Sequence, residues 1–399
     1  MSRAKTDILI SGGGIAGLTA AAAFGEAGFS VICVDPQPPV TEEANSKADL
    51  RTTAFLQPSR ETLQRAGLWD RLEPYAAPLA TMRIVDAGGE TPEPRIIKDF
   101  NADEISELPF GWNLPNWLLR REIIAKIQEL EDVTFLSGVK TERVLTRVSE
   151  AIVSLSNGQS VSARLLIAAD GRNSSVREAL EIPVKTYRYG QKALVFTVTH
   201  NIPHENISTE VHRSGGPFTL VPLPDTDGIH MSAVVWMEKA AEVERLLTLD
   251  EELFNQEITT RSAQVLGPLT LKGRRTAWPI IGQLASRMHG ERTALMAEAA
   301  HVVPPIGAQG LNMSLGDLRA LLDLAIANPS ELGAATMLQE YDRVRHREVK
   351  IRVLGVDMLN RASMFGAQGL RDLRAGALNT LYSVRPIRKT LMRAGLGAD

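Results

Sequence analysis

The sequence predicts an α/β fold in which an antiparallel-sheet lobe is inserted into a domain built on a parallel sheet, followed by a C-terminal helical region. Three observations predict it. Residues 7–35 follow a strand, glycine loop, helix and strand pattern. Residues 183–275 change to strands of alternating character, and from residue 276 the chain returns to a buried strand and long helices. Because both buried-strand regions suit one parallel sheet, we expect the first domain to be discontinuous.

The first unit combines all the parts of a dinucleotide-binding βαβ motif. An apolar run at residues 7–11 leads into Gly12-x-Gly14-x-x-Gly17, then a small-residue helix, then a second apolar run that ends at Asp35. Gly12 permits a tight turn, Gly14 permits close approach of a pyrophosphate, and Gly17 permits close packing of helix on sheet. We therefore predict a dinucleotide site here rather than a glycine-rich turn without a ligand.

The helix of this unit supplies the charge that the ligand needs. Its first residues, Ile15 and Ala16, direct unpaired N–H groups and the positive end of the helix dipole toward the phosphates. Asp35 then lies where a ribose hydroxyl is expected, and an acidic residue there favours FAD or NAD over NADP.

Composition limits the class of protein. The chain has 399 residues, a hydrophobic fraction of 44%, a charged fraction of 23% and a net charge of −3. These values are typical of a soluble globular protein with more than one lobe, and they give no reason to expect nucleic-acid binding or disorder.

The sequence also predicts the cellular compartment of the protein. The one cysteine, Cys33, lies in an apolar run, so we expect a buried thiol in a reducing environment and no internal disulfide. The first core strand is reached by Ile8 and no apolar run approaches the ~20 residues that span a bilayer. We therefore expect a cytoplasmic protein, or at most one that is peripheral on the inner membrane.

Each element can be assigned in order from its pattern. Residues 118–130 predict a helix, and a turn at Asn157-Gly158 joins two strands, the second of which is apolar throughout and ends at Asp170. In the inserted lobe we expect three long strands, one helix within residues 249–266 and a further strand before residue 281.

These assignments predict the following boundaries: the dinucleotide-binding domain in three parts (1–80, 111–182 and 276–345), a substrate-domain excursion (81–110), the substrate domain (183–275) and the C-terminal helical region (346–399). Within the first part, Arg51 opens a strand-like segment. It is either a solvated charge or a cofactor-side arginine, and the sequence favours neither.

Three segments together carry a resemblance to a known family. They are Gly12-x-Gly14-x-x-Gly17, the run DGRNSSVR at residues 170–177, and AEAAH at residues 297–301 followed by PPIGAQGLN at residues 304–312. In order and spacing they resemble the group A FAD-dependent aromatic hydroxylases, the para-hydroxybenzoate hydroxylase superfamily, and are most similar to its ubiquinone-biosynthesis branch. The resemblance covers nearly the whole chain and implies a Rossmann-like FAD domain.

The resemblance assigns the loop at residues 304–312 to the flavin ring. It implies that Pro304 and Pro305 lie beside the ring where oxygen reacts, although a loop-shaping role is the alternative for this pair. Backbone N–H groups at the start of the following helix would stabilise negative charge at the flavin pyrimidine. The cofactor contacts implied in this segment are Gly307, Gly310, Leu311 and Asn312.

The resemblance also assigns residues outside that loop. Asp170, Gly171 and Arg177 are implied in contact with FAD and with NAD(P)H, although Asp170 is also placed to cap the following helix. Arg120, which has Arg121 beside it, matches a position where the family often has a cofactor-contacting arginine.

One departure from the family concerns the ribityl chain of FAD. The family usually has Gly-Asp where this chain has Ala297-Glu298, so the carboxylate is kept on a longer side chain and a Cβ is added. We therefore expect Glu298 to retain the cofactor contact, with weaker FAD binding.

The resemblance implies an enzyme, a FAD-dependent monooxygenase that takes electrons from NAD(P)H. Its reaction would add oxygen to an aromatic ring through a flavin C4a-hydroperoxide. The expected substrate is a polyprenyl phenol of ubiquinone biosynthesis. The alternatives are a small soluble phenolic or heteroaromatic compound and, because of Ala297-Glu298, a flavin-weak, non-catalytic component of a biosynthetic complex.

Some residues are given no catalytic role. No side chain in residues 183–275 identifies itself as a substrate base, and His301 has no nucleophile or metal-ligand spacing around it, so we expect a structural role for it. No pair of histidines or cysteines predicts a metal site.

The C-terminal region predicts a contact surface. Residues 371–393 contain six basic residues and one acidic residue interleaved with apolar ones. This pattern suits peripheral contact with an anionic membrane or contact with a partner in a ubiquinone-biosynthesis complex, and a solvated terminal helix is the alternative.

Overall fold

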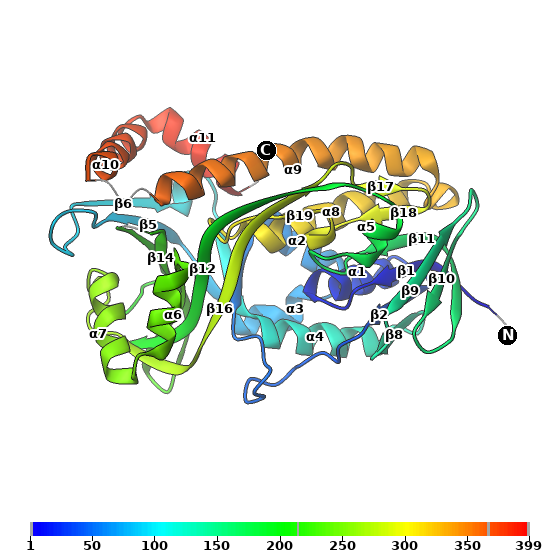
Figure 1. Ribbon diagram of the computed structural model, residues 1–399, viewed down its shortest axis with the longest axis horizontal. Helices are drawn as coiled ribbons and strands as arrows, with labels where there is room; N and C mark the ends of the chain where they lie inside the picture. The colour runs from blue at the N-terminus through cyan, green and yellow to red at the C-terminus, as the bar shows by residue number, and fades with distance from the viewer. Residues whose placement is uncertain (1–2, 214, 365–367, 397–399) are drawn as a thin grey trace.

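A computed structural model describes residues 3–213, 215–364 and 368–396 of the chain. It has the predicted α/β fold, with one sheet in each of two lobes and a long helix along one edge (Figure 1). Among the described residues, the helices are α1 (Ile15–Glu26), α2 (Gln57–Arg65), α3 (Trp69–Leu72), α4 (Asn116–Gln128), α5 (Ser175–Ala179), α6 (Ala240–Thr248), α7 (Glu251–Arg261), α8 (Gln309–Ala327), α9 (Ala335–Ser363), α10 (Gln368–Ser383) and α11 (Arg385–Leu396).

The first sheet is parallel at its centre. Its strand β1 pairs in parallel with β2 on one side and β11 on the other, and the apolar residues Ile8–Ile10 are fully buried between layers. Apolar runs of this kind form central strands because both faces are covered. The strands are β1 (Ala4–Ser11), β2 (Val31–Asp35), β8 (Val133–Ser137), β9 (Thr141–Thr146), β10 (Ala151–Leu155), β11 (Ser160–Ala168), β17 (His289–Gly290) and β18 (Thr293–Leu295).

This sheet joins segments that are far apart in the sequence. β18 pairs in parallel with β11, so residues after the inserted lobe complete the sheet that begins at the N-terminus. The predicted turn at Asn157-Gly158 is confirmed, because β10 and β11 form an antiparallel pair on either side of it.

The second sheet forms the inserted lobe and is mostly antiparallel. The long strands β12 and β16 run through the middle of the molecule in Figure 1, and α6 and α7 cover the lobe's outer side. Its strands are β5 (Thr81–Asp86), β6 (Ile96–Asn101), β12 (Val184–His200), β13 (Ile207–His212), β14 (Pro217–Thr226), β15 (Ile229–Lys239), β16 (Thr270–Ala285) and β19 (His301–Val302).

Two details of this lobe differ from the sequence expectation. The structure has two helices, α6 and α7, where we expected one, and an additional strand, β13, between β12 and β14. β13 is short, and it pairs in parallel with β5, a strand more than 120 residues earlier, so no local pattern marks it. The excursion strands β5 and β6 thus belong to the lobe's sheet.

A small third sheet connects the two lobes. Its strands are β3 (Thr52–Leu56), β4 (Ala77–Leu79) and β7 (Gly111–Pro115). Among the described residues, no helix combines the length and apolar character needed to cross a membrane.

Candidate cofactor site

The loop between β1 and α1 leaves N–H groups open to an outside anion. Gly12 has a φ of +113°, and a Cβ there would lie 2.2 Å from the carbonyl oxygen of Ala169. A Cβ on Gly17 would lie 1.9 Å from the Gly12 carbonyl oxygen, whereas one on Gly14 would meet no atom within 4 Å. α1 begins at Ile15 with no side-chain cap and no acidic residue in its first turn. The N–H groups of that turn therefore suit a phosphate.

Asp35 ends β2 beside this loop. Its Oδ2 accepts a hydrogen bond from the backbone N–H of Gly13 at 2.6 Å, and its Oδ1 accepts one from Gln37 at 2.7 Å. The carboxylate thus holds the glycine loop in shape at the carboxyl edge of the parallel sheet, which is where such sheets bind nucleotides. Its contact with a ribose stays a prediction.

Arg51 belongs to a cluster that the sequence analysis did not find. Asp49 accepts hydrogen bonds from Nε of Arg51 at 2.8 Å and from Nδ2 of Asn116 at 3.0 Å. Burial raises the pKa of Asp49, but the Arg51 and Asn116 bonds outweigh it and hold the pKa below its usual value. The Arg51 guanidinium lies 4.4 Å from the ring centre of Trp278 on β16. Arg51 is therefore paired and stacked rather than solvated alone, and it joins the cofactor domain to the lobe.

Arg120 faces the same cluster from α4. Its Nη2 lies 3.9 Å from Oδ2 of Asp49, and its buried Nε has no hydrogen-bond partner among the described residues. Arg121 points elsewhere, with its Nε donating to Glu122 at 2.8 Å. Of the two neighbouring arginines, Arg120 is the one with a buried donor left for a ligand.

Asp170, which follows β11, uses one carboxylate oxygen within the protein and leaves the other without a partner among the described residues. Oδ2 of Asp170 accepts hydrogen bonds from Oγ of Ser175 and from the backbone N–H of Val176, both at 3.2 Å, so this oxygen caps α5. The buried Oδ1 has no partner among the described residues. A Cβ on Gly171 would meet no atom within 4 Å. One face of Asp170 and the backbone beside it are thus open.

Arg177 has a structural role in this fold. The side chain is buried, and its guanidinium donates to the carbonyl oxygens of Ala299 at 2.8 Å and Arg172 at 2.9 Å. These bonds fix the segment after β11 against the segment that contains Ala297 and Glu298. Arg177 therefore positions two predicted cofactor segments relative to each other.

Ala297 has the backbone conformation that glycine usually provides. Its φ is +54°, in the left-handed region, and its N–H donates to Oδ2 of Asp317 at 3.1 Å. Glu298, which is half exposed, lies next along the chain with its Oε2 3.3 Å from Nε of Arg172. The Cβ added by the departure from Gly-Asp is thus on a strained residue.

His301 has a structural role, as expected. Its Nε2 lies 2.7 Å from Oδ2 of Asp317, and Oδ1 of Asp317 accepts from Nε of Arg345 at 3.0 Å. All three side chains are buried. Burial raises the pKa of Asp317, but the charges of His301 and Arg345 together hold it below its usual value. The sequence analysis missed Asp317 and Arg345, and the only signal was an acid among the apolar positions of α8.

The proline and glycine loop leads directly into α8. Pro304 is buried and Pro305 is exposed, so the two prolines have different surroundings. Ala308, with a φ of +56°, precedes the first turn of α8, which has no side-chain cap, and a Cβ on Gly310 would meet no atom within 4 Å. This turn is a second set of N–H groups with open space beside it. α8 begins at Gln309, so the last residues that the sequence analysis assigned to the loop, Gly310 to Asn312, lie in the first turn of the helix.

Asn312 ties this loop to the third sheet. Its Oδ1 accepts from the backbone N–H of Leu56 at 2.9 Å, and its Nδ2 donates to the carbonyl oxygen of Ala54 at 2.7 Å. The side chain of Asn312 is therefore occupied by the protein, and Leu311 beside it packs against the main core. Contact of either residue with a cofactor would be through the backbone.

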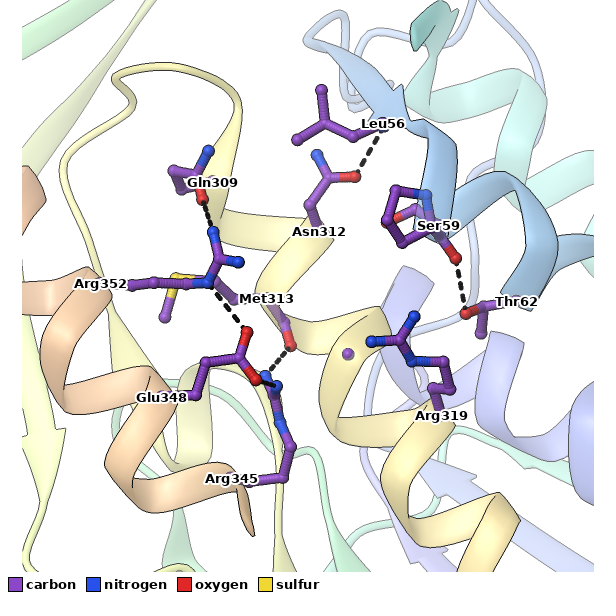
Figure 2. Close-up of a pocket in the computed structure, with 12 residues that line it drawn as sticks. Leu56, Ser59, Thr62, Gln309, Asn312, Met313, Arg319, Arg345, Glu348 and Arg352 are labelled. Atoms are coloured by element: carbon purple, nitrogen blue, oxygen red, sulfur yellow. Dashed lines mark hydrogen bonds and ion pairs between the residues drawn. The ribbon is translucent and has the colours of Figure 1, made fainter. Parts of the chain in front are cut away.

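A small polar cavity lies behind α8 (Figure 2). It has a volume of about 40 Å³ and lies between α2, α8 and α9. Figure 2 shows Arg319 and Thr62 on one side of the cavity, and Arg352 and Arg345 extending from α9 on the other. This volume suits a few water molecules and is too small for an aromatic substrate. The lining includes Gln309 and Asn312, so the cavity lies against the first turn of α8.

Comparison with known proteins identifies the family. The model of the family described as FAD binding domain matches residues 5–353. The chain belongs to this family. It is a FAD-dependent monooxygenase with the fold that the sequence predicted.

The relatives are similar along nearly their whole length. Ubiquinone hydroxylase UbiL of Rhodospirillum rubrum is 31% identical, covering 98% of this chain and 89% of the relative. The human ubiquinone biosynthesis monooxygenase COQ6 is 26% identical over 97% of this chain and 91% of its own. The 3-demethoxyubiquinol 3-hydroxylase of Escherichia coli is 24% identical, covering 100% of both chains.

Solved structures share the fold at lower identity. The p-nitrophenol 4-monooxygenase PnpA of Pseudomonas putida has a TM-score of 0.79 at 18% identity, covering 100% of this chain and 99% of its own. The monooxygenase pqsL of Pseudomonas aeruginosa has a TM-score of 0.77 at 22% identity, covering 94% and 100%.

The residues of this site fit FAD. The open, uncapped turn at Gly14 suits the pyrophosphate, and the open turn at Gly310 suits the flavin end. Nε of Arg120 and Oδ1 of Asp170 are buried polar atoms that lack a partner in the described protein, as expected where a ligand completes the bonding. The contacts made by each individual residue stay predictions.

Proposed function

We propose that this monooxygenase hydroxylates the aromatic ring of a polyprenyl phenol, a precursor of ubiquinone, with O2 as co-substrate and NAD(P)H as electron donor. The observation that carries the proposal is the 31% identity to a ubiquinone hydroxylase over 98% of the chain. The similarity includes the inserted lobe as well as the FAD domain. Because the lobe is where we expect the substrate, similarity there bears on substrate class.

The loop at residues 304–312 packs directly against the inserted lobe. Ile306, which follows the proline pair, packs with Val195 of β12, Met237 of β15 and Ile280 of β16. Val356 of α9 closes the same cluster. These side chains are buried, so they fix the loop against the apolar strands of the lobe.

The protein's contribution is to bind, orient and exclude water. When bound, FAD would supply the oxygen-activating chemistry, and the first turns of α1 and α8 would hold it. The first turn of α8 favours negative charge beside it through its free N–H groups. The Arg51–Trp278 contact joins the cofactor domain to the inserted lobe.

The test uses the FAD-loaded full chain and two substrates. We expect a phenol with a short prenyl tail in detergent micelles to stimulate NAD(P)H oxidation and to gain one oxygen atom by mass spectrometry. A soluble phenol such as 4-hydroxybenzoate is the comparison. Hydroxylation of the soluble phenol alone would contradict the proposal and favour the second substrate class.

One observation favours a second candidate function, a flavin-weak component of a biosynthetic complex. Ala297 holds a left-handed backbone where the family has glycine, which penalises the local geometry of the cofactor site. A visible spectrum of the purified protein, taken before and after addition of FAD, separates the two functions. A flavin spectrum supports the hydroxylase, and a colourless protein that FAD does not reconstitute supports the complex component.

A further inference from the structure

The outward face of α9 carries an unusual row of apolar side chains. Between residues 344 and 359 these side chains recur at spacings of 3, 4 and 7 positions, so they lie along one side of the helix. Helix faces toward water are normally polar. The residues, with their exposed fractions, are Val344 (44%), Ile351 (62%), Leu354 (50%), Met358 (70%) and Leu359 (59%).

The charged residues on this face are mostly basic. Arg343 pairs with Glu340, and Arg361 pairs with Asp357. Arg347 and Lys350 are exposed and make no ion pair within the part of the chain that the structure describes. The row of apolar side chains is therefore bordered by positive charge that no acidic residue of the described part of the chain neutralises.

This combination fits an anionic lipid surface better than it fits a protein. A second copy of the chain would bring Arg347 and Lys350 close to their own counterparts, which is unfavourable. Protein interfaces are enriched in aromatic residues, and the row has none. Aliphatic side chains bordered by long basic ones are typical of helices that lie in the membrane interface, where the basic groups reach the headgroups.

The position of the helix connects this face to the reaction site. Figure 1 shows α9 along the upper edge of the molecule. On its opposite side Val356 packs against Ile306, next to the proline pair of the flavin loop. A membrane in contact with the outward face would thus be separated from that loop by the thickness of one helix, about 10 Å.

We propose that the outward face of α9, from Val344 to Arg361, docks on an anionic lipid bilayer. The basic residues predicted for this role in residues 371–393 are partly used within the protein. Arg388 forms an ion pair with Glu104, and Nζ of Lys389 donates to the Glu104 carbonyl oxygen at 2.7 Å. The proposal does not rest on the identity of the substrate.

Vesicle flotation with the FAD-loaded full chain tests the proposal. We expect binding to vesicles of three parts phosphatidylcholine and one part phosphatidylglycerol, with much weaker binding to phosphatidylcholine alone and loss of binding at high salt. The double change Leu354→Glu and Met358→Glu is expected to weaken binding about tenfold or more. The double change Arg347→Glu and Lys350→Glu is expected to weaken vesicle binding by about fivefold for each residue changed.

Controls make the result specific to α9. Leu253→Glu changes a 48% exposed leucine on α7, and Arg385→Glu with Arg393→Glu changes basic residues of α11. Both are expected to bind vesicles as the parent does, and all variants are expected to keep parental FAD content and melting temperature. Binding that the α9 changes leave intact, or no binding by the parent, would overturn the proposal. A parent dimer in light scattering that Leu354→Glu dissociates would overturn it too, by assigning this face to a second copy.

Discussion

Ala297 is the residue at which backbone geometry bears most directly on the cofactor. Its left-handed φ of +54° costs an alanine roughly 1–2 kcal/mol, because the Cβ approaches the following carbonyl oxygen. The neighbouring Glu298 leaves the segment with its side chain paired to Arg172. Where the family usually has Gly-Asp, this chain therefore has a strained backbone at Ala297 and a longer acidic side chain at Glu298.

We predict that Ala297→Gly raises the free energy of unfolding by up to about 1 kcal/mol, since relief of strain exceeds the added chain entropy of glycine. With Glu298→Asp added, FAD is expected to dissociate more slowly. Stopped-flow release of FAD and urea unfolding measure the two effects.

Ala263→Gly is the matched control. Ala263 has a φ of +52° in the inserted lobe, so it should gain similar stability without a change in FAD release. An unchanged FAD release rate in the Ala297→Gly, Glu298→Asp variant would show that this departure does not weaken cofactor binding.

Asp317 is the residue on which the back of the site depends. It is completely buried between His301 and Arg345 and accepts the N–H of Ala297. We predict that Asp317→Asn lowers the free energy of unfolding by about 3 kcal/mol, because it removes the buried carboxylate between His301 and Arg345 and leaves Arg345 only its pair with the partly exposed Glu348. Asp323 lies on α8, as Asp317 does, and forms an exposed pair with Arg65 of α2. Asp323→Asn should lower the free energy of unfolding by about 1 kcal/mol or less.

The sign of the pH dependence of Asp317 follows from its lowered pKa. The folded state holds the carboxylate ionised more strongly than the unfolded state does, so the stabilisation is complete above the unfolded pKa of 3.8 and is lost as the pH falls further. In Asp317→Asn this part of the acid dependence should disappear. Acid sensitivity equal to the parent's in that variant would contradict the assignment.

At the scale of elements, the far end of the lobe has its own titrating group. His200 of β12 is buried, with its Nε2 2.9 Å from Oγ of Ser232 on β15, and the rings of His204 and His230 lie within 6.1 Å of it. Burial lowers the pKa of His200, and the neighbouring histidines lower it further, although the Ile202 carbonyl and Asp225 act against this.

We predict that the lobe loses stability on mild acidification. Because the folded state binds the proton of His200 less readily than the unfolded state, stability is complete above the unfolded pKa of 6.5 and falls as the pH drops below it. Urea midpoints at pH 7.5 and 5.5 measure the loss, which should shrink in His200→Gln. His346→Gln, which changes a half-buried histidine of α9, should leave the loss as in the parent.

At the scale of the whole molecule, the cofactor site joins segments far apart in the chain. The loop at Gly14, the segment at Asp170 and the first turn of α8 come from three parts of the sequence. Arg177 fixes the segment at Asp170 to Ala299, and Asn312 fixes the first turn of α8 to β3. A ligand that contacts all three stabilises the native state as a unit.

We therefore predict that FAD at a hundredfold excess over its dissociation constant stabilises the protein by about 2.7 kcal/mol. Differential scanning calorimetry should show the rise in melting temperature in one cooperative transition. Riboflavin, which lacks the pyrophosphate, should give a much smaller rise. An equal effect of both compounds would contradict the role of the loop at Gly14.

The sequence by itself determined the fold class and, through the resemblance, the family and its FAD cofactor, and it predicted a dinucleotide site at the first βαβ unit. These follow from local patterns: the glycine spacing from Gly12 to Gly17, the buried strand before Asp170, and the loop from Pro304 to Asn312. Each pattern is readable because its physical cause, a tight turn or a strand buried on both faces, acts over a few neighbouring residues.

Only the tertiary structure decided which polar residues face one another. The Asp49–Arg51–Arg120 cluster, the ion pairs of Asp317 and the pairing of β13 with β5 join residues that are distant in sequence. The same holds for α9, whose sequence shows a helix, while its burial against the second sheet decides which apolar residues remain outside. Contacts of this kind depend on how the elements pack, and packing energy is set by the whole chain rather than by any one segment.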